Sequence, residues 1–180
     1  MDPTVWGATA EETTARYPCD DHAPAHAESL FRAVTVHAPR ERVYRWLCQL
    51  KVAPYSYDLL DNGGRRSPRT LTPGADELAR GDRILIFTLV DFAPGEHLTL
   101  RLTDPRALAV FGPLTITYAI RDGGPDTVRL VVKLLLGRRG DGALDAVRRR
   151  ALIWGDLLMM RKQLHNLRDL AETAVQRSTS

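Results

Sequence analysis

Asp156 is a carboxylate set among apolar residues that recur at helical spacing. At 100° per residue it lies about 60° from Ile153 and about 40° from Met160 on a helical wheel. A carboxylate so close to an apolar face is expected to be either paired or protonated. The sequence predicts a buried partner for an arginine, for example one from residues 55–68, and this is the interpretation we favour. The alternative is a general acid or base, or a polar anchor for a ligand.

Tyr118 carries an aromatic hydroxyl in the apolar register of a predicted strand, on the face that it shares with Ile116 and Ile120. A buried tyrosine hydroxyl needs a hydrogen-bond partner. That partner is either a ligand oxygen or a group of the protein core, and the sequence leaves both open. If the protein is an enzyme, Asp156 and Tyr118 are the groups expected to move protons.

Residues 55–68 (YSYDLLDNGGRRSP) combine aromatic, acidic and basic side chains with no regular period, which predicts a loop. Tyrosines offer aromatic area with a polar tip, and arginines bind carboxylates or developing negative charge. The predicted ligand contacts here are Tyr55, Tyr57, Asp58, Arg65 and Arg66, and Arg66 is a third catalytic candidate. The interpretation we favour is a self-contained loop joined by Asp–Arg pairs around an Asn62-Gly63 turn, and ligand contact is the alternative.

Motifs for other chemistries are absent from the sequence. The five histidines form no HExxH or other zinc-binding spacing, and the two cysteines form no CxxC pair. There is also no GxSxG elbow, phosphate-binding loop or dinucleotide fingerprint. We therefore expect no metal and no cofactor, so that any chemistry would be cofactor-free.

The charge balance argues against nucleic acid as a partner. Lysine and arginine number 25 against 22 acidic residues, a formal net charge of +3. The most basic region comprises Arg138 and Arg139 with the run Arg148, Arg149 and Arg150, and such runs usually form a solvated face. Binding of this region to nucleic acid or to an anionic membrane surface is a third hypothesis, behind ligand binding and catalysis.

Hydrophobic periodicity predicts the elements that position these residues. Residues 30–37 have strand composition, residues 39–50 have one apolar helical face, and from residue 82 the chain alternates as antiparallel strands. One-sided alternation predicts a sheet with one face toward a core and the other toward water. A helix over residues 144–175 carries the apolar stripe that would cover the core face. Within it, Gly155 costs about 1 kcal/mol relative to alanine, so we expect another segment to approach it closely.

The order of strand, short helices, antiparallel strands and long terminal helix resembles the START-like (SRPBCC) superfamily over about residues 31–172. The segments FRAVTVHAPRERVYRWLCQLKVAPYSYDLLDNGGRRSPRTLTPG and GDLLMMRKQL are similar to a bacterial polyketide cyclase/dehydrase-like subgroup. The resemblance implies an α+β helix-grip fold, a curved antiparallel sheet around the terminal helix with two short helices after the first strand. It also implies an apolar cavity between sheet and helix. Its predicted lining, besides Tyr118 and Asp156, is Leu100, Ile116, Leu130, Ile153, Leu157 and Met160.

The resemblance implies binding of a hydrophobic small molecule that is polyketide-like, lipid-like or otherwise cyclic and apolar. The alternative is a cofactor-free cyclase, aromatase or dehydratase that uses the same cavity. We expect an irregular arm over residues 1–28, one domain over residues 29–177 and a tail over residues 178–180. We also expect a cytoplasmic protein, because the sequence has only two cysteines, with no CxxC spacing, and nothing that resembles a secretory signal. We expect no membrane span, because no apolar run approaches the roughly 20 residues that cross a bilayer. The resemblance implies a bacterial protein, and monomer and homodimer both stay open.

Overall fold

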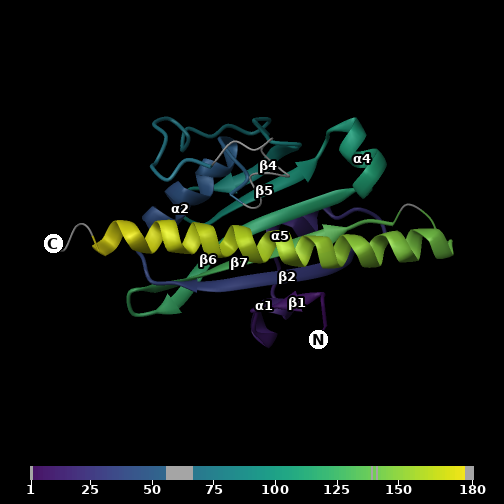
Figure 1. Cartoon of the computed structure of the whole chain (residues 1–180), viewed down its shortest axis with the longest axis horizontal. Helices are drawn as coiled ribbons and strands as arrows, with labels where there is room; N and C mark the ends of the chain where they lie inside the picture. The colour runs from purple at the N-terminus through teal and green to yellow at the C-terminus, as the bar shows by residue number, and fades with distance from the viewer. Residues whose placement is uncertain (1, 56–66, 139, 141, 177–180) are drawn as a thin grey trace.

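The computed structural model describes residues 2–55, 67–138, 140 and 142–176. In this part of the chain, strands form a seven-stranded sheet of order β1-β2-β7-β6-β5-β4-β3, and a 34-residue helix, α5, lies across it (Figure 1). The strands are β1 (Val5–Trp6), β2 (Glu28–Val36), β3 (Arg83–Ile84), β4 (Phe87–Ala93), β5 (His97–Leu102), β6 (Leu114–Gly124) and β7 (Thr127–Leu136). The helices are α1 (Ala10–Thr14), η1 (Pro18–His22), α2 (Arg40–Cys48), η2 (Gln49–Lys51), α4 (Pro105–Phe111) and α5 (Ala143–Gln176).

The sheet is antiparallel except for its first pair, in which β1 runs parallel to β2. The β4–β5 hairpin turns at Gly95, whose φ of +77° is a conformation that glycine adopts without strain. Alternation places one side of each strand toward α5, and four strands align across that side. Arg32 of β2 is opposite Val132 of β7, which is opposite Tyr118 of β6 and, beyond it, Leu98 of β5.

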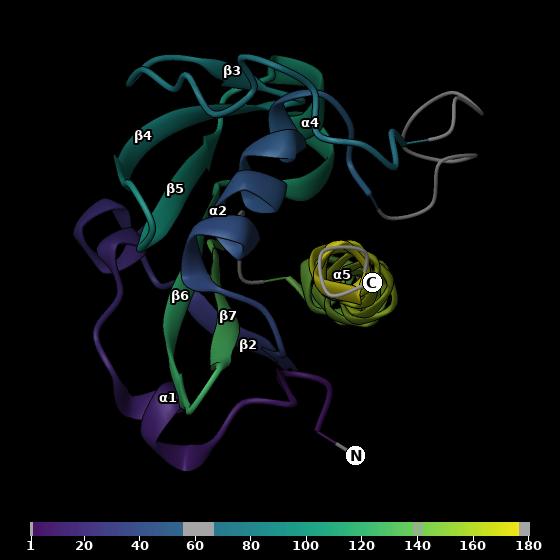
Figure 2. The ribbon, with the colours of Figure 1, turned by 90° about the vertical axis from the view of Figure 1, so that its left-hand side faces the viewer.

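The core lies between this face of the sheet and the inner face of α5. The inner residues of α5 follow the predicted stripe and are 7% exposed or less: Ile153, Leu157, Met160, Leu164, Leu167 and Ala171. Burial of such a stripe stabilises a long helix far more than intrinsic propensity does. The result is the predicted α+β helix-grip fold. Figure 2, a view along α5, shows the curved sheet beside the helix, with α2 between β6 and α5.

The helix predicted over residues 39–50 forms as α2 followed by the short 3₁₀ helix η2. Pro39 precedes its first turn, where the missing N–H of proline costs nothing. The predicted face is buried, with Val43 at 3%, Trp46 at 4% and Leu47 at 0% exposed. Tyr44 is also buried, so this helix is enclosed on more sides than its periodicity indicated.

The prediction that the outer face of the sheet meets water is wrong where the N-terminal segment covers it. Outward-facing Phe31, Val131 and Leu135 form a second buried cluster with Tyr17 and Cys19. Figure 2 shows α1 on the side of the sheet opposite α5. The physical reason is that these outward positions are apolar, so the sheet has two faces to bury.

Residues 2–27, predicted to be irregular, contain β1, α1 and η1. A capping box holds the start of α1, in which the Thr9 hydroxyl accepts from the Glu12 N–H and the Glu12 carboxylate accepts from the Thr9 N–H. Beside β1, the Phe31 N–H donates to the Thr4 carbonyl at 2.7 Å. These elements are too short to show a hydrophobic period, and their contacts with the sheet stabilise them.

Candidate functional site

Four buried polar side chains cross the interface between the sheet and α5. Two come from the strands, Arg32 of β2 and Tyr118 of β6, and flank Val132 on the inner face. Two come from α5, Asp156 and Gln163, which are seven residues apart and therefore lie on one side of the helix. The interface thus contains two polar pairs within an otherwise apolar core.

The first pair joins Arg32 to Asp156. The Arg32 side chain is 1% exposed, and its Nη2 lies 2.8 Å from Oδ2 of Asp156, whose side chain is 17% exposed. Nε of Arg32 donates to the same oxygen at 3.1 Å, and Nη1 donates to the carbonyls of Thr4 and Phe31, each at 2.9 Å. Asp156 is therefore the partner of a buried arginine, as we favoured, but that arginine comes from β2 and not from residues 55–68.

Burial raises the pKa of Asp156 to about 6, against the opposing attraction of the Arg32 guanidinium. A carboxyl group with such a pKa changes its charge close to neutral pH. This is the electrostatic property expected of a general acid or base. Oδ2 of this carboxylate, however, is already contacted by two nitrogen atoms of Arg32.

The second pair joins Tyr118 to Gln163. The tyrosine hydroxyl donates to Oε1 of Gln163 at 2.7 Å, and Nε2 of Gln163 donates to the Pro54 carbonyl at 2.6 Å. Burial, and after it the charge of Asp156, raise the pKa of Tyr118 far above its ordinary value. The phenol therefore stays protonated at neutral pH and acts as a hydrogen-bond donor. A core group provides its partner, which is one of the two alternatives open from sequence.

The other predicted contacts fall into two groups. Tyr55 is 2% exposed, packs edge-on against Trp46 with ring centroids 6.2 Å apart, and accepts through its carbonyl from Asn166 at 2.8 Å. One buried core cluster contains Leu100, Ile116, Leu130, Ile153 and Met160, and Leu157 is itself only 2% exposed. Tyr57, Asp58, Arg65 and Arg66 lie outside the described residues.

Sequence reasoning missed Arg32 and Gln163, although each left a signal. Arg32 falls in the apolar register of its strand, between Leu30 and Val34, so alternation alone points it inward. Gln163 lies seven residues after Asp156, on the buried side of the helix. A polar residue inside an apolar period is the pattern that would have identified both.

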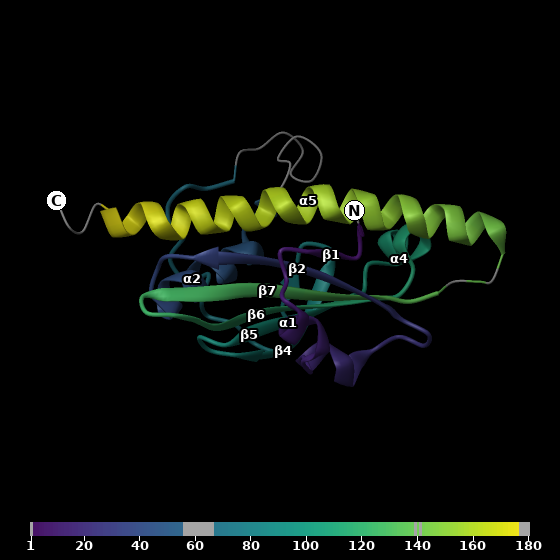
Figure 3. The ribbon, with the colours of Figure 1, turned by 90° about the horizontal axis from the view of Figure 1, so that it is seen from below.

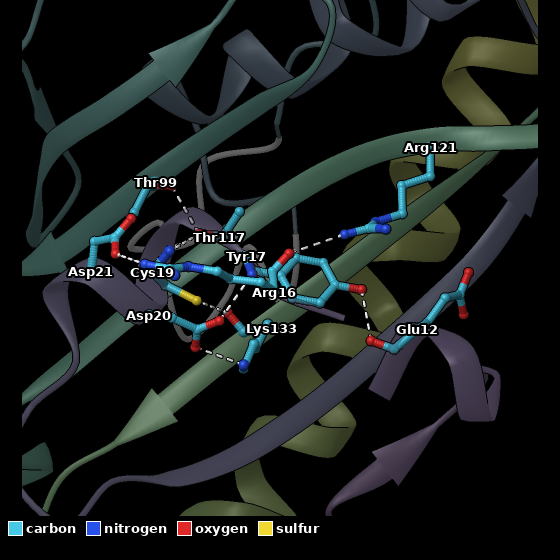
Figure 4. Close-up of polar contacts among 10 residues, drawn as sticks. All are labelled: Glu12, Arg16, Tyr17, Cys19, Asp20, Asp21, Thr99, Thr117, Arg121 and Lys133. Atoms are coloured by element: carbon cyan, nitrogen blue, oxygen red, sulfur yellow. Dashed lines mark hydrogen bonds and ion pairs between the residues drawn. The ribbon is translucent and has the colours of Figure 1, made fainter. Parts of the chain in front are cut away.

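A second polar cluster lies on the outer face of the sheet (Figure 4). The Cys19 N–H donates to the Thr117 hydroxyl at 2.9 Å, Thr117 contacts the Thr99 hydroxyl at 2.8 Å, and Lys133 pairs with Asp20 at 2.6 Å. Burial raises the pKa of the Cys19 thiol, so it remains protonated and a poor nucleophile. This cluster anchors the N-terminal segment and has no geometry suited to catalysis.

Two surface clefts are lined by described residues. One of about 810 Å³ lies between η1, α2, the β4–β5 turn and β6, and its charged lining includes Arg40, Glu41 and Glu96. The other, of about 460 Å³, lies between β2 and α5 beside Trp6 and His165. Neither is lined by any of the predicted cavity residues, so the cavity between sheet and α5 stays a prediction.

Within the described ranges, no group of three or more His, Cys, Asp or Glu side chains is arranged to hold a metal ion. No helix in the same part of the chain has the length and apolar character of a membrane span.

No family model and no curated protein matches this chain. Solved structures do. A protein from Thermobifida fusca is 14% identical, with 79% of this chain and 94% of that chain covered and a TM-score of 0.51. A protein from Mesorhizobium loti is 15% identical, with 79% and 96% covered and a TM-score of 0.50. An aromatase/cyclase from a Streptomyces species is 14% identical, with 83% and 96% covered and a TM-score of 0.48.

Structural similarity at identities this low shows a shared fold and nothing about function. The third structure, with a TM-score of 0.48, is not counted as support for the fold. The first two share the arrangement of this chain over most of their own length. The α+β helix-grip fold predicted from the sequence is therefore confirmed. Function must be argued from the chain's own residues.

Proposed function

We propose that this protein binds a hydrophobic small molecule between the inner face of the sheet and α5. The observation that carries the proposal is the composition of this interface. The side chains directed into it from β2, β5, β6, β7 and α5 are apolar, apart from the two polar pairs. A ligand seated there would be recognised by apolar contact, which is how most small-molecule sites bind.

The two polar pairs set the chemistry of that ligand. The donors and acceptors of Tyr118 and Gln163 are used within the protein, and Arg32 is held by Asp156 and two backbone carbonyls. A strongly polar ligand would have to break these contacts, and each unpaired buried group costs about 1–3 kcal/mol. The site therefore favours a polyketide-like, lipid-like or other cyclic apolar molecule with at most one polar group.

Two tryptophan substitutions in one strand test the position of the ligand. Leu130 of β7 is 1% exposed and faces α5, between Val34 of β2 and Ile120 of β6. Leu135 of the same strand is 3% exposed and belongs to the outer-face cluster. Leu130→Trp fills the proposed ligand space, whereas Leu135→Trp adds the same bulk on the other face and serves as the matched control.

Native mass spectrometry of protein purified from its own host gives the readout, with binding of N-phenyl-1-naphthylamine as a second measurement. We expect a small-molecule adduct in the wild type and in Leu135→Trp, and none in Leu130→Trp. An adduct that persists in Leu130→Trp would place the ligand elsewhere. Absence of both adduct and probe binding in the folded wild type would refute the proposal.

A cofactor-free cyclase, aromatase or dehydratase is the second candidate, and the pKa of Asp156 near 6 is the observation that favours it. In that case Asp156 exchanges protons with the bound molecule, Tyr118 donates a hydrogen bond, and Arg66 stabilises developing negative charge. The molecule captured by the wild type is the substrate to assay. Loss of turnover in Asp156→Asn with the ligand still bound would support catalysis, and unchanged turnover would exclude a role for Asp156.

A further inference from the structure

The outward face of α5 carries an apolar stripe that nothing in the described structure covers. Val147 is 69% exposed, Trp154 41% and Leu158 56%, and Ala151 lies between them. Steps of four, three and four residues place these four residues, the outer stripe, within about 60° on a helical wheel. On the same wheel the centre of the stripe lies about 130° from that of the inner residues that face the sheet, so this part of α5 is apolar on two sides.

The end of α4 also carries exposed apolar side chains. Val110 is 56% and Phe111 36% exposed, and Nε of Arg148 donates to the Val110 carbonyl at 2.6 Å, which ties α4 to α5. Figure 3 shows α4 beside the N-terminal part of α5, where the helix extends past the strands. Scattered exposed apolar residues are ordinary, but a row of them along one face of a helix indicates an interaction site.

The charges around the outer stripe are mostly basic. Between residues 145 and 169 the sequence contains six basic and three acidic residues, and each acidic one is paired: Asp145 with Arg148, Asp156 with Arg32 and Asp169 with Arg168. Arg148 and Arg149 are tied inside the fold by Asp145 and Glu28. The exposed basic side chains beside the stripe are those of Arg150, Arg161 and Lys162.

This charge distribution disfavours a second copy of the chain as the occupant. A twofold axis that pairs two α5 helices in antiparallel fashion places the same flank of each helix side by side. Arg150 and Arg161 lie within about 20° of each other on one flank of the wheel. Pairing would therefore bring four guanidinium groups together with no carboxylate between them on α5.

An anionic lipid surface suits both features. Amphipathic helices that lie in a membrane interface bury an apolar stripe, often with tryptophan, and direct basic side chains to the headgroups. We propose that the outer stripe of α5 docks on a bilayer containing anionic phospholipid. Trp154 and Leu158 enter the interface, and Arg150, Arg161 and Lys162 contact the phosphates. This inference does not depend on the ligand proposed for the interior.

Vesicle co-sedimentation tests this surface with the full chain. One vesicle contains equal parts phosphatidylglycerol and phosphatidylcholine, and the other contains phosphatidylcholine alone. We expect binding to the anionic vesicle that weakens with salt, and a blue shift of tryptophan emission. Each basic side chain near an anionic surface strengthens binding about fivefold, so Arg150→Gln with Lys162→Gln should weaken it about 25-fold.

Trp154→Ser with Leu158→Ser removes the apolar contact and should abolish binding. Val52→Ser is the matched control, because Val52 is 41% exposed, as Trp154 is, but lies at the end of η2, outside the stripe. Unchanged melting temperatures establish that all variants are folded. Since these residues are exposed, the substitutions should not unfold the protein.

Three results would overturn the proposal. The first is that the wild type binds neither vesicle. The second is that the Trp154→Ser, Leu158→Ser variant binds as well as the wild type. The third is that vesicle binding is absent and sedimentation velocity shows a wild-type dimer that Leu158→Ser converts to a monomer. The last result would make the stripe a contact between two copies. Leu130→Trp, which alters only the interior, should bind vesicles normally, so failure of the ligand proposal and failure of this one are distinguishable.

Discussion

Replacing Asp156 by asparagine keeps the shape of the side chain and removes its charge. The ionised carboxylate is buried against Arg32, and burial raises its pKa from 3.8 to about 6. The folded state therefore binds the proton more tightly than the unfolded state does. The stability that this group contributes is fully present below pH 3.8 and is lost as the pH rises through about 6.

The size of the effect follows from the shift. A difference of about 2 pKa units corresponds to about 1.4 kcal/mol for each unit. Ionisation of Asp156 therefore lowers the free energy of unfolding by about 3 kcal/mol. The Asp156 side chain is 17% exposed, so solvent screens little of this. Below pH 4 the protonated wild type and Asp156→Asn both offer Arg32 a neutral partner and should be about equally stable. By pH 7 the variant should be the more stable by about 3 kcal/mol.

Urea unfolding of both proteins from pH 4 to pH 7, followed by circular dichroism, measures this difference. Other titrating groups are shared and cancel when the two free energies of unfolding are subtracted. Glu12→Gln is the control of opposite sign. Burial works to raise the pKa of Glu12, but hydrogen bonds from Arg129 and the Thr9 N–H outweigh it and hold that pKa below its ordinary value. Here the wild type should gain over the variant only as the pH rises toward 4.5, the ordinary pKa, and the difference should stay constant above that pH.

One result would refute this reasoning about Asp156. If Asp156→Asn loses about 3–5 kcal/mol at pH 7, as is typical when one partner of a buried ion pair is removed, the Arg32 attraction outweighs desolvation. The pKa of Asp156 would then lie below 3.8, and the carboxylate would stay charged throughout the neutral range. The proposal that it acts as an acid or base near neutrality would fail with it.

Three further changes test the packing. Tyr118→Phe leaves Oε1 of Gln163 without its donor and should cost about 1–3 kcal/mol in guanidinium unfolding, and no loss would mean that this bond is replaced in the variant. Gly155→Ala should raise the free energy of unfolding by up to about 1 kcal/mol, because a Cβ there meets nothing within 4 Å, and a loss would indicate a contact. Lys133→Met removes the charge that pairs with Asp20, so amide exchange at Cys19 should accelerate, and unchanged exchange would show that the segment is held without this pair.

Local periodicity was sufficient to predict most of the fold. Period-two alternation located the strands, and steps of three and four residues located the inner face of α5, because burial imposes these periods on any sequence that folds this way. The same argument placed Asp156 and Tyr118 at the interface before their partners were known. It could not give those partners. Arg32 and Asp156 are 124 residues apart, and their contact depends on how the helix lies across the sheet.

The structure differs from the sequence predictions at positions where contacts between distant segments determine the surroundings of a residue. Gly155 has open space beside it, so no segment in the described part of the chain approaches it closely. The outer face of the sheet is covered because Tyr17 and Cys19 fold back onto it, a contact that no local period signals. A helical wheel likewise does not predict whether a second apolar stripe on α5 is buried or exposed. The sequence by itself determined the elements and their inward faces, since each is a property of consecutive residues. Only the tertiary structure decided which polar groups meet and which apolar surface stays uncovered, because both depend on contacts between distant segments.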